Sequence, residues 1–288
     1  MIISRVEGGL GNQMFIYAMG LALSLRSQQS LMLDISNSNY ESGDRFGRTF
    51  RLDQFCLRAT IADPTLVGQY SRSSRYFYWR RKLSNYLPIS RRPIIEEPRV
   101  NPLHRHSISP QGTTYVIGYW QDEAFFADCQ ENIYLDFTYK KPFSETTQAL
   151  ANLTHSERTA FIHVRRRDYP FRLTINYYRA AITKLQREYQ VTKFFVFGDD
   201  PAWTQQHLFP LGNMQFLDQA NSRSEHEDLW LMAQFRFGII ANSSFSWWAA
   251  WLAAKRYPDA LMICPSTWGY LTNPSRRFQQ LASQFEPA

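Results

Sequence analysis

The chain begins with MIISRVEGGLGNQMFIYAMGLALSLRSQQSLMLD, residues 1–34, and this stretch decides the fold. Residues 1–6 are largely apolar, which predicts a short buried strand that runs into the glycine-rich turn EGGLGNQM. The segment SLMLDIS predicts a second strand that ends near Asp34. Between them, apolar residues recur at the three-to-four spacing of a helix: Met14, Ala18, Leu21, Ala22 and Leu25. Strand, glycine turn, helix and strand form a βαβ unit, so the sequence favours a parallel sheet.

The same alternation resumes after a polar, proline-containing segment, YKKPFSETTQ at residues 139–148, which predicts a linker. Beyond it, the strand-like stretches AFIHV, KFFVFG, FGIIA and ALMIC alternate with helical patterns. We therefore expect two α/β domains, residues 1–150 and 151–288, that face a central cleft.

Composition limits the class of protein. The 288 residues are 44% hydrophobic and 16% aromatic, enough for a core, which excludes a disordered chain. The net charge of +7 suggests anionic partners, whether phosphates, nucleic acid or a membrane surface.

Three cysteines, Cys56, Cys129 and Cys264, fit no disulfide framework and no metal spacing, which predicts reduced thiols in a cytosolic protein. We see no secretory leader and no spanning segment, and so expect a cytoplasmic protein, with peripheral contact at the inner membrane surface as a further expectation.

The glycine turn is the first candidate site. Gly9, Gly11 and Asn12 lie where a strand meets the start of a helix, and backbone N–H groups there favour an anion. The turn lacks the Lys-Ser/Thr pair of a P-loop, and Met14 replaces the third glycine of the dinucleotide fingerprint. Asp34 stands near the ribose-reading position of that fold, so an NAD-dependent oxidoreductase remains an alternative. A tight turn that simply needs glycine is the structural alternative.

The stretch FIHVRRRDY, residues 161–169, is the second candidate site. The strand delivers its arginines at its carboxyl end, where α/β folds bind ligands. The planar guanidinium of Arg165 or Arg166 suits the paired oxygens of a diphosphate. Asp168 is a candidate partner for an arginine or a candidate base, whereas a histidine such as His163 more often packs than catalyses. A solvated charged loop is the alternative.

Two further segments complete the set. In IIANSSFSWWAAWL, the residues Ser243, Ser244 and Ser246 either cap a helix or offer hydroxyl and N–H groups to a phosphate. In VFGDDPAW, Asp199 and Asp200 precede a helix, where acids cap, bind a metal or read a guanine or ribose. Their spacing is not Asp-x-Asp, so we expect no metal. Together the four segments predict a nucleoside diphosphate held without a metal.

Residues 71–111 mix arginines with the aromatic run YFYW. The favoured interpretation is a solvated helix whose aromatic side packs inward. A non-catalytic module that binds nucleic acid or an anionic lipid surface is the alternative. No nucleic-acid-binding motif accompanies the stretch, so we expect no nucleic acid partner.

Five segments in order, GGLGNQMFIYA, HVRRRDY, FGDDPAW, EDLWLMA and ANSSFSWWAAWL, resemble the motifs of bacterial α-1,2-fucosyltransferases of glycosyltransferase family 11. RTFRLDQF and GYWQDEAFF are similar to further family segments. The resemblance implies a GT-B fold of two Rossmann-like domains, the first facing the acceptor and the second holding the donor. It implies an inverting, metal-independent enzyme of glycan biosynthesis, as for O-antigen. This enzyme would move L-fucose from GDP-β-L-fucose to the 2-hydroxyl of a terminal galactose in an oligosaccharide or lipid-linked glycan.

The resemblance also implies roles for single residues. Arg165 and Arg166, with His163 beside them, match the pair that binds the donor diphosphate, and Asp199 or Asp200 matches the acid that reads guanosine. Further matches are the serines near the phosphates and the N-terminal loop over the donor: Ser243, Ser244, Ser246, Gly9, Gly11 and Asn12. We expect Arg165 to stabilise the leaving phosphate and Asp168 to be the base. The chain departs from the family at Arg167, where glycine is usual, and in the short segment after Tyr169, which puts the acceptor in doubt.

Overall fold

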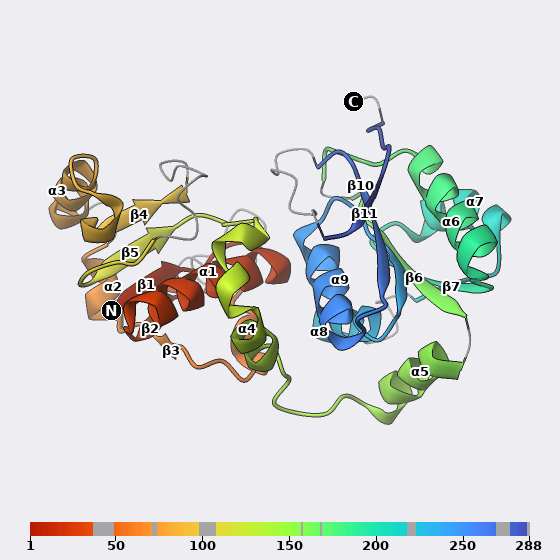
Figure 1. Ribbon diagram of the computed structural model, residues 1–288, viewed down its shortest axis with the longest axis horizontal. Helices are drawn as coiled ribbons and strands as arrows, with labels where there is room; N and C mark the ends of the chain where they lie inside the picture. Colours follow the sequence, from red (N-terminus) through yellow and green to blue (C-terminus); the bar gives the residue numbers. More distant parts are fainter. Residues whose placement is uncertain are drawn as a thin grey trace. The chain divides into compact units, whose positions relative to one another are not determined.

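The computed structural model describes residues 1–36, 49–70, 74–97, 108–156, 158–167, 169–217, 223–268 and 277–286. The chain forms two compact units, Met1–Lys141 and Pro142–Ala288, each built on a parallel sheet (Figure 1). Helix α5 (Glu145–Ser156) contains the expected boundary at residue 150, and it packs within the second unit. There Thr147 Oγ1 donates a hydrogen bond to Glu227 Oε1 over 2.8 Å. The division therefore falls ahead of α5, in the predicted linker.

The first unit confirms the predicted βαβ start. Its strands are β1 (Ile2–Arg5), β2 (Leu31–Asp34), β3 (Thr60–Ile61), β4 (Ile94–Glu96) and β5 (Thr114–Ile117). They pair in the order β3-β2-β1-β5-β4, with every described pairing parallel. The long helix α1 (Leu10–Ser27) joins β1 to β2, and the shorter helices are α2 (Pro64–Gly68), α3 (Arg75–Ser84) and α4 (Gln130–Asp136).

The core of the first unit lies on both faces of its sheet. Helix α1 is buried along nearly its whole length, because its apolar residues cover more than one side. On the opposite face, Ile3 and Ile94 pack with the ring of Tyr115. That ring stacks on Tyr70 with centroids 4.3 Å apart, and Phe77 anchors α3 to the same cluster.

Helix α3 corrects an expectation. Phe77 is buried, but the other three residues of the aromatic run, Tyr76, Tyr78 and Trp79, are exposed. The interpretation that the aromatic side packs inward is therefore wrong for most of the run. One helical face cannot hold four consecutive residues, since each successive side chain turns by about 100°.

The second unit carries the larger sheet. Its strands are β6 (Thr159–Val164), β7 (Lys193–Gly198), β8 (Met214–Phe216), β9 (Phe237–Ile239), β10 (Leu261–Pro265) and β11 (Gln279–Leu281). Their order is β11-β10-β9-β6-β7-β8, with all described pairings parallel. Helices α6 (Ile175–Tyr189) and α7 (Pro201–His207) lie on one side of the sheet, and α8 (Glu225–Met232) and α9 (Ser244–Arg256) on the other (Figure 1).

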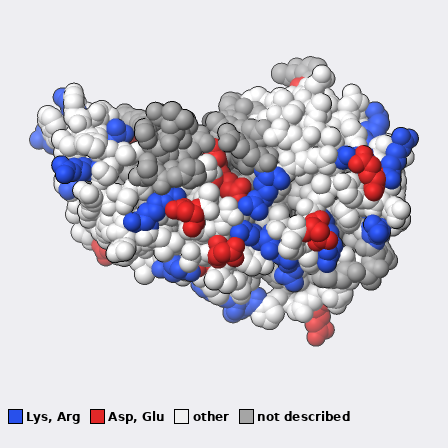
Figure 2. Space-filling model, in the orientation of Figure 1, with Lys and Arg blue, Asp and Glu red and all other residues white. Residues whose placement is uncertain are grey.

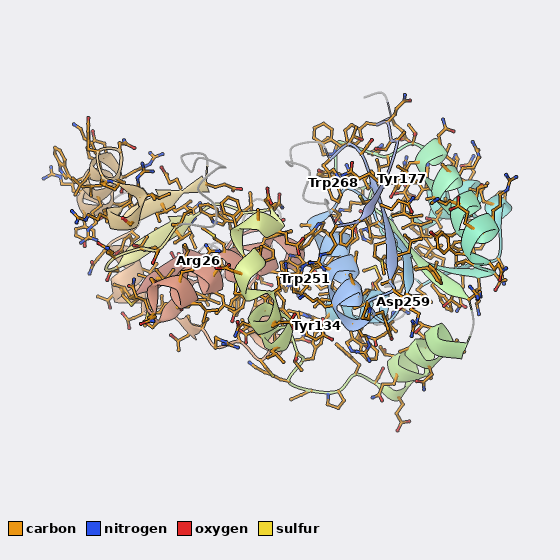
Figure 3. The ribbon with its side chains drawn as sticks, in the orientation of Figure 1. Arg26, Tyr134, Tyr177, Trp251, Asp259 and Trp268 are labelled. Carbon is orange, nitrogen blue, oxygen red and sulfur yellow. The ribbon has the colours of Figure 1, made fainter. Side chains whose placement is uncertain are left out.

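Buried aromatics fix these helices to the sheet. Tyr177 on α6 lies against the strands (Figure 3), and its hydroxyl donates to the carbonyls of Ile240, at 2.7 Å, and Ile263, at 3.2 Å. Trp251 on α9 is fully buried and meets Trp248 edge to face. The hydroxyl of Tyr177 thus fixes α6 to the chain at the end of β9 and to β10. No helix in the described part of the chain is long and apolar enough to span a membrane.

Candidate functional site

The second sheet has a topological switch point between β6 and β9. From β6 the chain proceeds through β7 to β8 on one side, then returns to β9 on the other side of β6. In such sheets ligands bind beyond the carboxyl ends of the two strands where the order reverses. The predicted arginine segment follows β6, and the predicted serine segment follows β9. The ring of His163 lies 5.7 Å from that of Phe245 on the first turn of α9, so the fold brings these segments together.

Arg165 is the arginine that the switch point presents. Its side chain is 32% exposed, and its Nη1 lies 3.3 Å from Asp199 Oδ2, a loose ion pair. The carboxylate holds one edge of the guanidinium and leaves part of the side chain accessible to a ligand. A partly exposed guanidinium at the carboxyl end of a strand is suited to binding phosphate oxygens.

Arg166 turns the other way and is only 8% exposed. Its Nη1 and Nη2 donate to the two carboxylate oxygens of Glu286 over 2.9 and 2.8 Å. Its Nε lies 3.4 Å from Asp200 Oδ2, and its guanidinium carbon lies 4.1 Å above the ring of Trp203. These contacts occupy the guanidinium inside the unit. They favour a positioning role for Arg166 over the diphosphate contact expected from the sequence.

The arginine segment continues with Arg167 and Asp168. The side chain of Arg167 is exposed, while its backbone N–H donates to Asp199 Oδ2 over 3.3 Å. Asp168, the expected base, lies outside the described residues.

The two aspartates after β7 organise the site from within. Asp199 Oδ1 accepts the N–H of Arg166 over 2.8 Å, so this carboxylate ties the loop after β6 to the end of β7. The strands approach closely here, because a Cβ at Gly198 would lie 2.5 Å from the carbonyl oxygen of Val164. Asp200 accepts the N–H of Trp203 over 3.1 Å and thereby caps α7. Both aspartates therefore have partners within the unit. Recognition of guanosine by either of them stays a prediction.

The amino terminus of α9 is open. Ser243 is the N-cap residue, but its hydroxyl makes no capping hydrogen bond. The neighbouring Asn242 is buried and donates its amide to the carbonyl of Phe171 over 2.9 Å. Among the described residues, Asn242 Oδ1 has no hydrogen-bond partner. Ser243 and Ser244 are half-buried at this end, and the dipole of α9 favours an anion there.

Ser246 differs from the other two serines. It is fully buried, and its hydroxyl lies 3.3 Å from the carbonyl oxygen of Ala241 and 3.4 Å from that of Ser243. This hydroxyl therefore closes the turn between β9 and α9. The contact favours a structural role over the donor contact expected from the sequence.

His163 is buried on β6 and uncharged at neutral pH. Burial, reinforced by the positive charge of Arg165, lowers its pKa to about 3. The ring therefore contributes no positive charge to a diphosphate. Its role here is to pack against Phe245 beneath the site.

The first sheet also reverses its order, between β1 and β5, and the glycine turn lies at that point. Gly8 has a left-handed backbone (φ +80°), and an added Cβ would lie 2.8 Å from Asn12 Nδ2. Asn12 Oδ1 accepts a hydrogen bond from Gln121 Nε2 over 2.7 Å, which joins the turns after β1 and β5. Gly8 was not among the expected site residues, although a Gly-Gly pair at a strand end is a signal for such a turn.

Of the expected residues in this loop, Gly9 is the N-cap of α1 and Gly11 is buried in its first turn. Gln13 is fully buried, and its amide donates to the carbonyls of Gly8 and Thr49, each over 2.8 Å. The loop is thus a fixed turn of the first unit. A role for Gly9, Gly11 and Asn12 toward a donor stays a prediction.

The hydrogen bonds of Asp34 argue against the alternative that the chain is an NAD-dependent oxidoreductase. It is buried, and it accepts hydrogen bonds from the hydroxyl of Tyr115 over 2.5 Å and from the N–H of Ser36 over 2.9 Å. A ribose-reading carboxylate presents its oxygens to the cofactor. Asp34 instead stabilises the sheet.

Sequence reasoning missed the C-terminal segment. Leu173 forms an antiparallel bridge with Phe285, and the N–H of Glu286 donates to the carbonyl of Arg172 over 2.8 Å. Residues 283–286 thereby run beside the loop that follows the arginines and bring Glu286 to Arg166. No sequence signal joins two residues that are 120 positions apart.

The comparisons with known proteins agree with this architecture. The family model Glycosyl transferase family 11 matches residues 100–271. The alpha-1,2-colitosyltransferase of Escherichia coli is 30% identical, over 93% of this chain and 92% of that protein. The O-antigen biosynthesis glycosyltransferase WbnK of Escherichia coli is 26% identical, over 95% and 96%.

Solved structures show the same fold. The fucosyltransferase NodZ from Bradyrhizobium aligns with a TM-score of 0.50 at 14% identity, over 86% of this chain and 91% of that chain. A FUT1 mutant of Arabidopsis thaliana in complex with GDP aligns with a TM-score of 0.50 at 10% identity, over 88% and 68%. The two parallel-sheet units are therefore those of a GT-B glycosyltransferase. Within that class, the chain belongs to glycosyltransferase family 11, which confirms the resemblance read from its motifs.

Proposed function

We propose that this glycosyltransferase moves L-fucose from GDP-β-L-fucose to the 2-hydroxyl of a terminal galactose, with inversion at the anomeric carbon. Family membership supports glycosyl transfer, and the names of two relatives point to an α-1,2 linkage and to O-antigen acceptors. NodZ, which shares the fold, has been soaked with GDP-fucose and co-crystallised with GDP.

The observation that carries the proposal is the placement of Arg165 and of the amino terminus of α9 at the ends of two neighbouring strands. Both lie at the carboxyl edge of the sheet, on the strands that flank the switch point. One supplies a half-exposed guanidinium, and the other supplies backbone N–H groups and a helix dipole. A diphosphate is the ligand that uses both together.

The chemistry follows from this placement. The acceptor hydroxyl attacks the anomeric carbon from the face opposite GDP and forms the new C–O bond. The bond between the sugar and the β-phosphate breaks, and GDP leaves with that electron pair. Negative charge grows on the departing phosphate, where the guanidinium of Arg165 stabilises it, so we expect no requirement for a divalent metal.

The attacking hydroxyl loses its proton, and we assign that proton to Asp168. A base must lie within hydrogen-bond reach of the hydroxyl. The competing possibility is that Asp168 only orients an arginine. The pH dependence of the residual rate of Asp168→Asn separates the two: loss of the acidic limb supports the base role, and an unchanged limb contradicts it.

The proposal is tested by incubating the full chain with GDP-fucose and lactose in the presence of EDTA, and reading the product linkage by NMR. An α-1,2-fucosyl product formed at an undiminished rate is expected. A different linkage, or a rate that EDTA abolishes and Mg²⁺ or Mn²⁺ restores, contradicts it.

Colitose is a second candidate for the transferred sugar, because a colitosyltransferase is the relative with 30% identity. Colitose is L-fucose without its 3-hydroxyl, so the same diphosphate site serves either donor. GDP-colitose offered in competition with GDP-fucose distinguishes them. A kcat/KM that favours GDP-colitose assigns that sugar and replaces fucose in the proposal.

A further inference from the structure

Helix α3 and the turn after it carry an unusual concentration of exposed apolar side chains. Ten large hydrophobic side chains are exposed among the described residues, and five of them fall between residues 76 and 86. They are Tyr76 (39%), Tyr78 (60%), Trp79 (61%), Leu83 (50%) and Tyr86 (79%). Scattered exposed hydrophobics are ordinary, whereas a contiguous group marks an interaction surface.

The helix presents these residues on one face. Phe77 and Ser84 are its buried residues, and they point inward to the sheet of the first unit. At about 100° per residue, Trp79 and Leu83 lie on the side opposite those two, flanked by Tyr78 and Tyr76. Helix α3 thus rests on the unit by a narrow stripe and turns its aromatic face outward.

The same segment is strongly basic. Residues 74–95 contain six Lys or Arg and no Asp or Glu: Arg75, Arg80, Arg81, Lys82, Arg91 and Arg92. Figure 2 shows basic side chains over this end of the first unit, which is labelled α3 in Figure 1. Arg81 is held by Glu96 over 2.9 Å, while Arg75 and Lys82 are exposed on the outward side.

Cations and aromatic rings also contact each other on this surface. The guanidinium of Arg80 lies 4.2 Å from the ring centroid of Tyr76, and Lys82 Nζ lies 5.4 Å from that of Trp79. Tyrosine and tryptophan favour the boundary between water and lipid, because one part of the ring is apolar and the other polar. Lysine and arginine attract anionic headgroups at the same depth.

We propose that the outward face of α3, with Tyr86, docks on a bilayer surface that contains anionic phospholipid. The aromatic and leucine side chains enter the headgroup region, and the surrounding cations bind lipid phosphates. The uniform positive sign of residues 74–95 selects this occupant over an uncharged apolar partner. The proposal does not rest on the donor site or on the proposed sugar.

Co-sedimentation of the full chain with vesicles tests the proposal. We compare vesicles of phosphatidylcholine with vesicles in which phosphatidylglycerol replaces part of it. The expected result is binding to the anionic vesicles alone, weakened by salt. Arg75→Glu with Lys82→Glu should lower this binding by more than about 25-fold, since loss of each cation alone removes about a fivefold preference and each new carboxylate repels the anionic lipid. The triple variant Tyr78→Ser, Trp79→Ser, Leu83→Ser should also lose most of it.

Matched variants control for charge and hydrophobicity. Arg179→Glu with Arg187→Glu makes the same change in net charge on the exposed face of α6, and Leu135→Ser with Phe209→Ser removes exposed hydrophobics elsewhere. Both should bind as the wild type does. The proposal is overturned if the wild type binds neither vesicle or both equally, or if the control pairs lose as much. A wild-type dimer that the triple variant dissociates, without vesicle binding, would assign the face to a second copy and also overturns it.

Discussion

The three consecutive arginines after β6 occupy three different environments. Arg165 stands half-exposed beside Asp199, Arg166 is buried against Glu286 and Trp203, and Arg167 is exposed. Adjacent guanidinium groups repel one another, and the chain relieves this repulsion with its own carboxylates. Arg165 and Arg166 are therefore held in place by the protein itself, and charges fixed in this way are the condition for strong electrostatic stabilisation of a leaving group.

Arg165→Ala should lower kcat by on the order of 10²–10³-fold, the usual cost of removing one preorganised donor. Arg167→Ala, its neighbour on the exposed side, should retain most of the wild-type rate. Initial rates at saturating donor, with far-ultraviolet circular dichroism as the check on folding, measure both. A folded Arg165→Ala protein with near wild-type kcat would remove the assignment.

Glu286→Gln should destabilise the second unit by about 2 kcal/mol, because the buried Arg166 loses the carboxylate that binds both of its Nη atoms. Glu188→Gln is the matched control, since Glu188 pairs with Lys184 on the exposed surface of α6 and should matter by less than about 0.5 kcal/mol. Urea unfolding measures both. If Glu286 also positions the arginine loop, Glu286→Gln should lower kcat even at a temperature where the variant is folded, and Glu286→Asp should restore part of the loss. Equal effects of Glu286→Gln and Glu188→Gln on stability and kcat would contradict the positioning role.

His163 predicts a pH dependence of stability. Its pKa is about 3 in the folded protein against an ordinary value of 6.5, so the unfolded chain binds the proton more readily. Above about pH 6.5 the ring is neutral in both states and does not affect the unfolding free energy. Below that pH the unfolded chain takes up the proton first, so the unfolding free energy falls by about 1.4 kcal/mol per pH unit until the pH reaches about 3. His163→Gln should flatten the unfolding free energy measured between about pH 7 and about pH 5. An unchanged slope would contradict a buried neutral ring.

At the scale of elements, two helices of the second unit begin differently. The hydroxyl of Ser224 accepts the N–H of Glu227 over 3.3 Å, and the Glu227 carboxylate accepts the N–H of Ser224 over 2.8 Å, a complete capping box on α8. Ser243 opens α9 with no side-chain cap. Helix α6 also begins without a side-chain cap, at Thr174, so the missing cap alone does not make a site. At α9 it coincides with the switch point, where the donor phosphate is proposed to bind.

Ser224→Ala should cost about 1 kcal/mol of stability and leave the donor KM unchanged. Ser243→Ala should do the reverse, with little effect on stability and a raised KM for the GDP-sugar. Urea unfolding and steady-state kinetics on both variants check the pair. Equal loss of stability in the two variants would mean that Ser243 caps its helix in solution.

The sequence predicted the helices and strands better than it predicted the directions of individual side chains. Hydrophobic period and the glycine turn indicated β1, α1 and β2, and the strand before the arginines indicated β6. The direction of each side chain after a strand was not predictable in this way. Arg166 turns inward because Glu286 and Trp203 bind its guanidinium inside the unit. Glu286 lies in a C-terminal segment that contains no recognisable motif. Ser246 turns inward for a similar reason, since its hydroxyl closes the turn after β9.

At the scale of the whole molecule, each unit has its own parallel sheet and its own core. Strand order could not be read from the sequence, because a parallel sheet of six strands can be wound in several ways from the same succession of elements. The order creates the candidate site, since it places the arginine segment and the serine segment on neighbouring strands. Five ordered motifs supplied the family, but the residues that hold those motifs in place came only from the fold.

The cysteines give a test of the two cores. Cys129 and Cys264 are buried and Cys56 is exposed, and burial raises the pKa of the Cys129 thiol to about 12. A thiolate is the reactive form, so Ellman's reagent should label one thiol quickly in the native chain and all three after denaturation. Cys56→Ser should remove the fast phase. Rapid labelling of more than one thiol in the native chain would contradict the buried positions.

The return of residues 283–286 to the arginine loop also bears on how the gene tolerates damage. A stop codon or frameshift ahead of residue 283 removes this segment. Here it deletes the bridge from Phe285 to Leu173 and the counter-ion of Arg166. We expect alleles that lose this segment to be inactive in glycosyl transfer, although they keep both sheets and every motif of the candidate site.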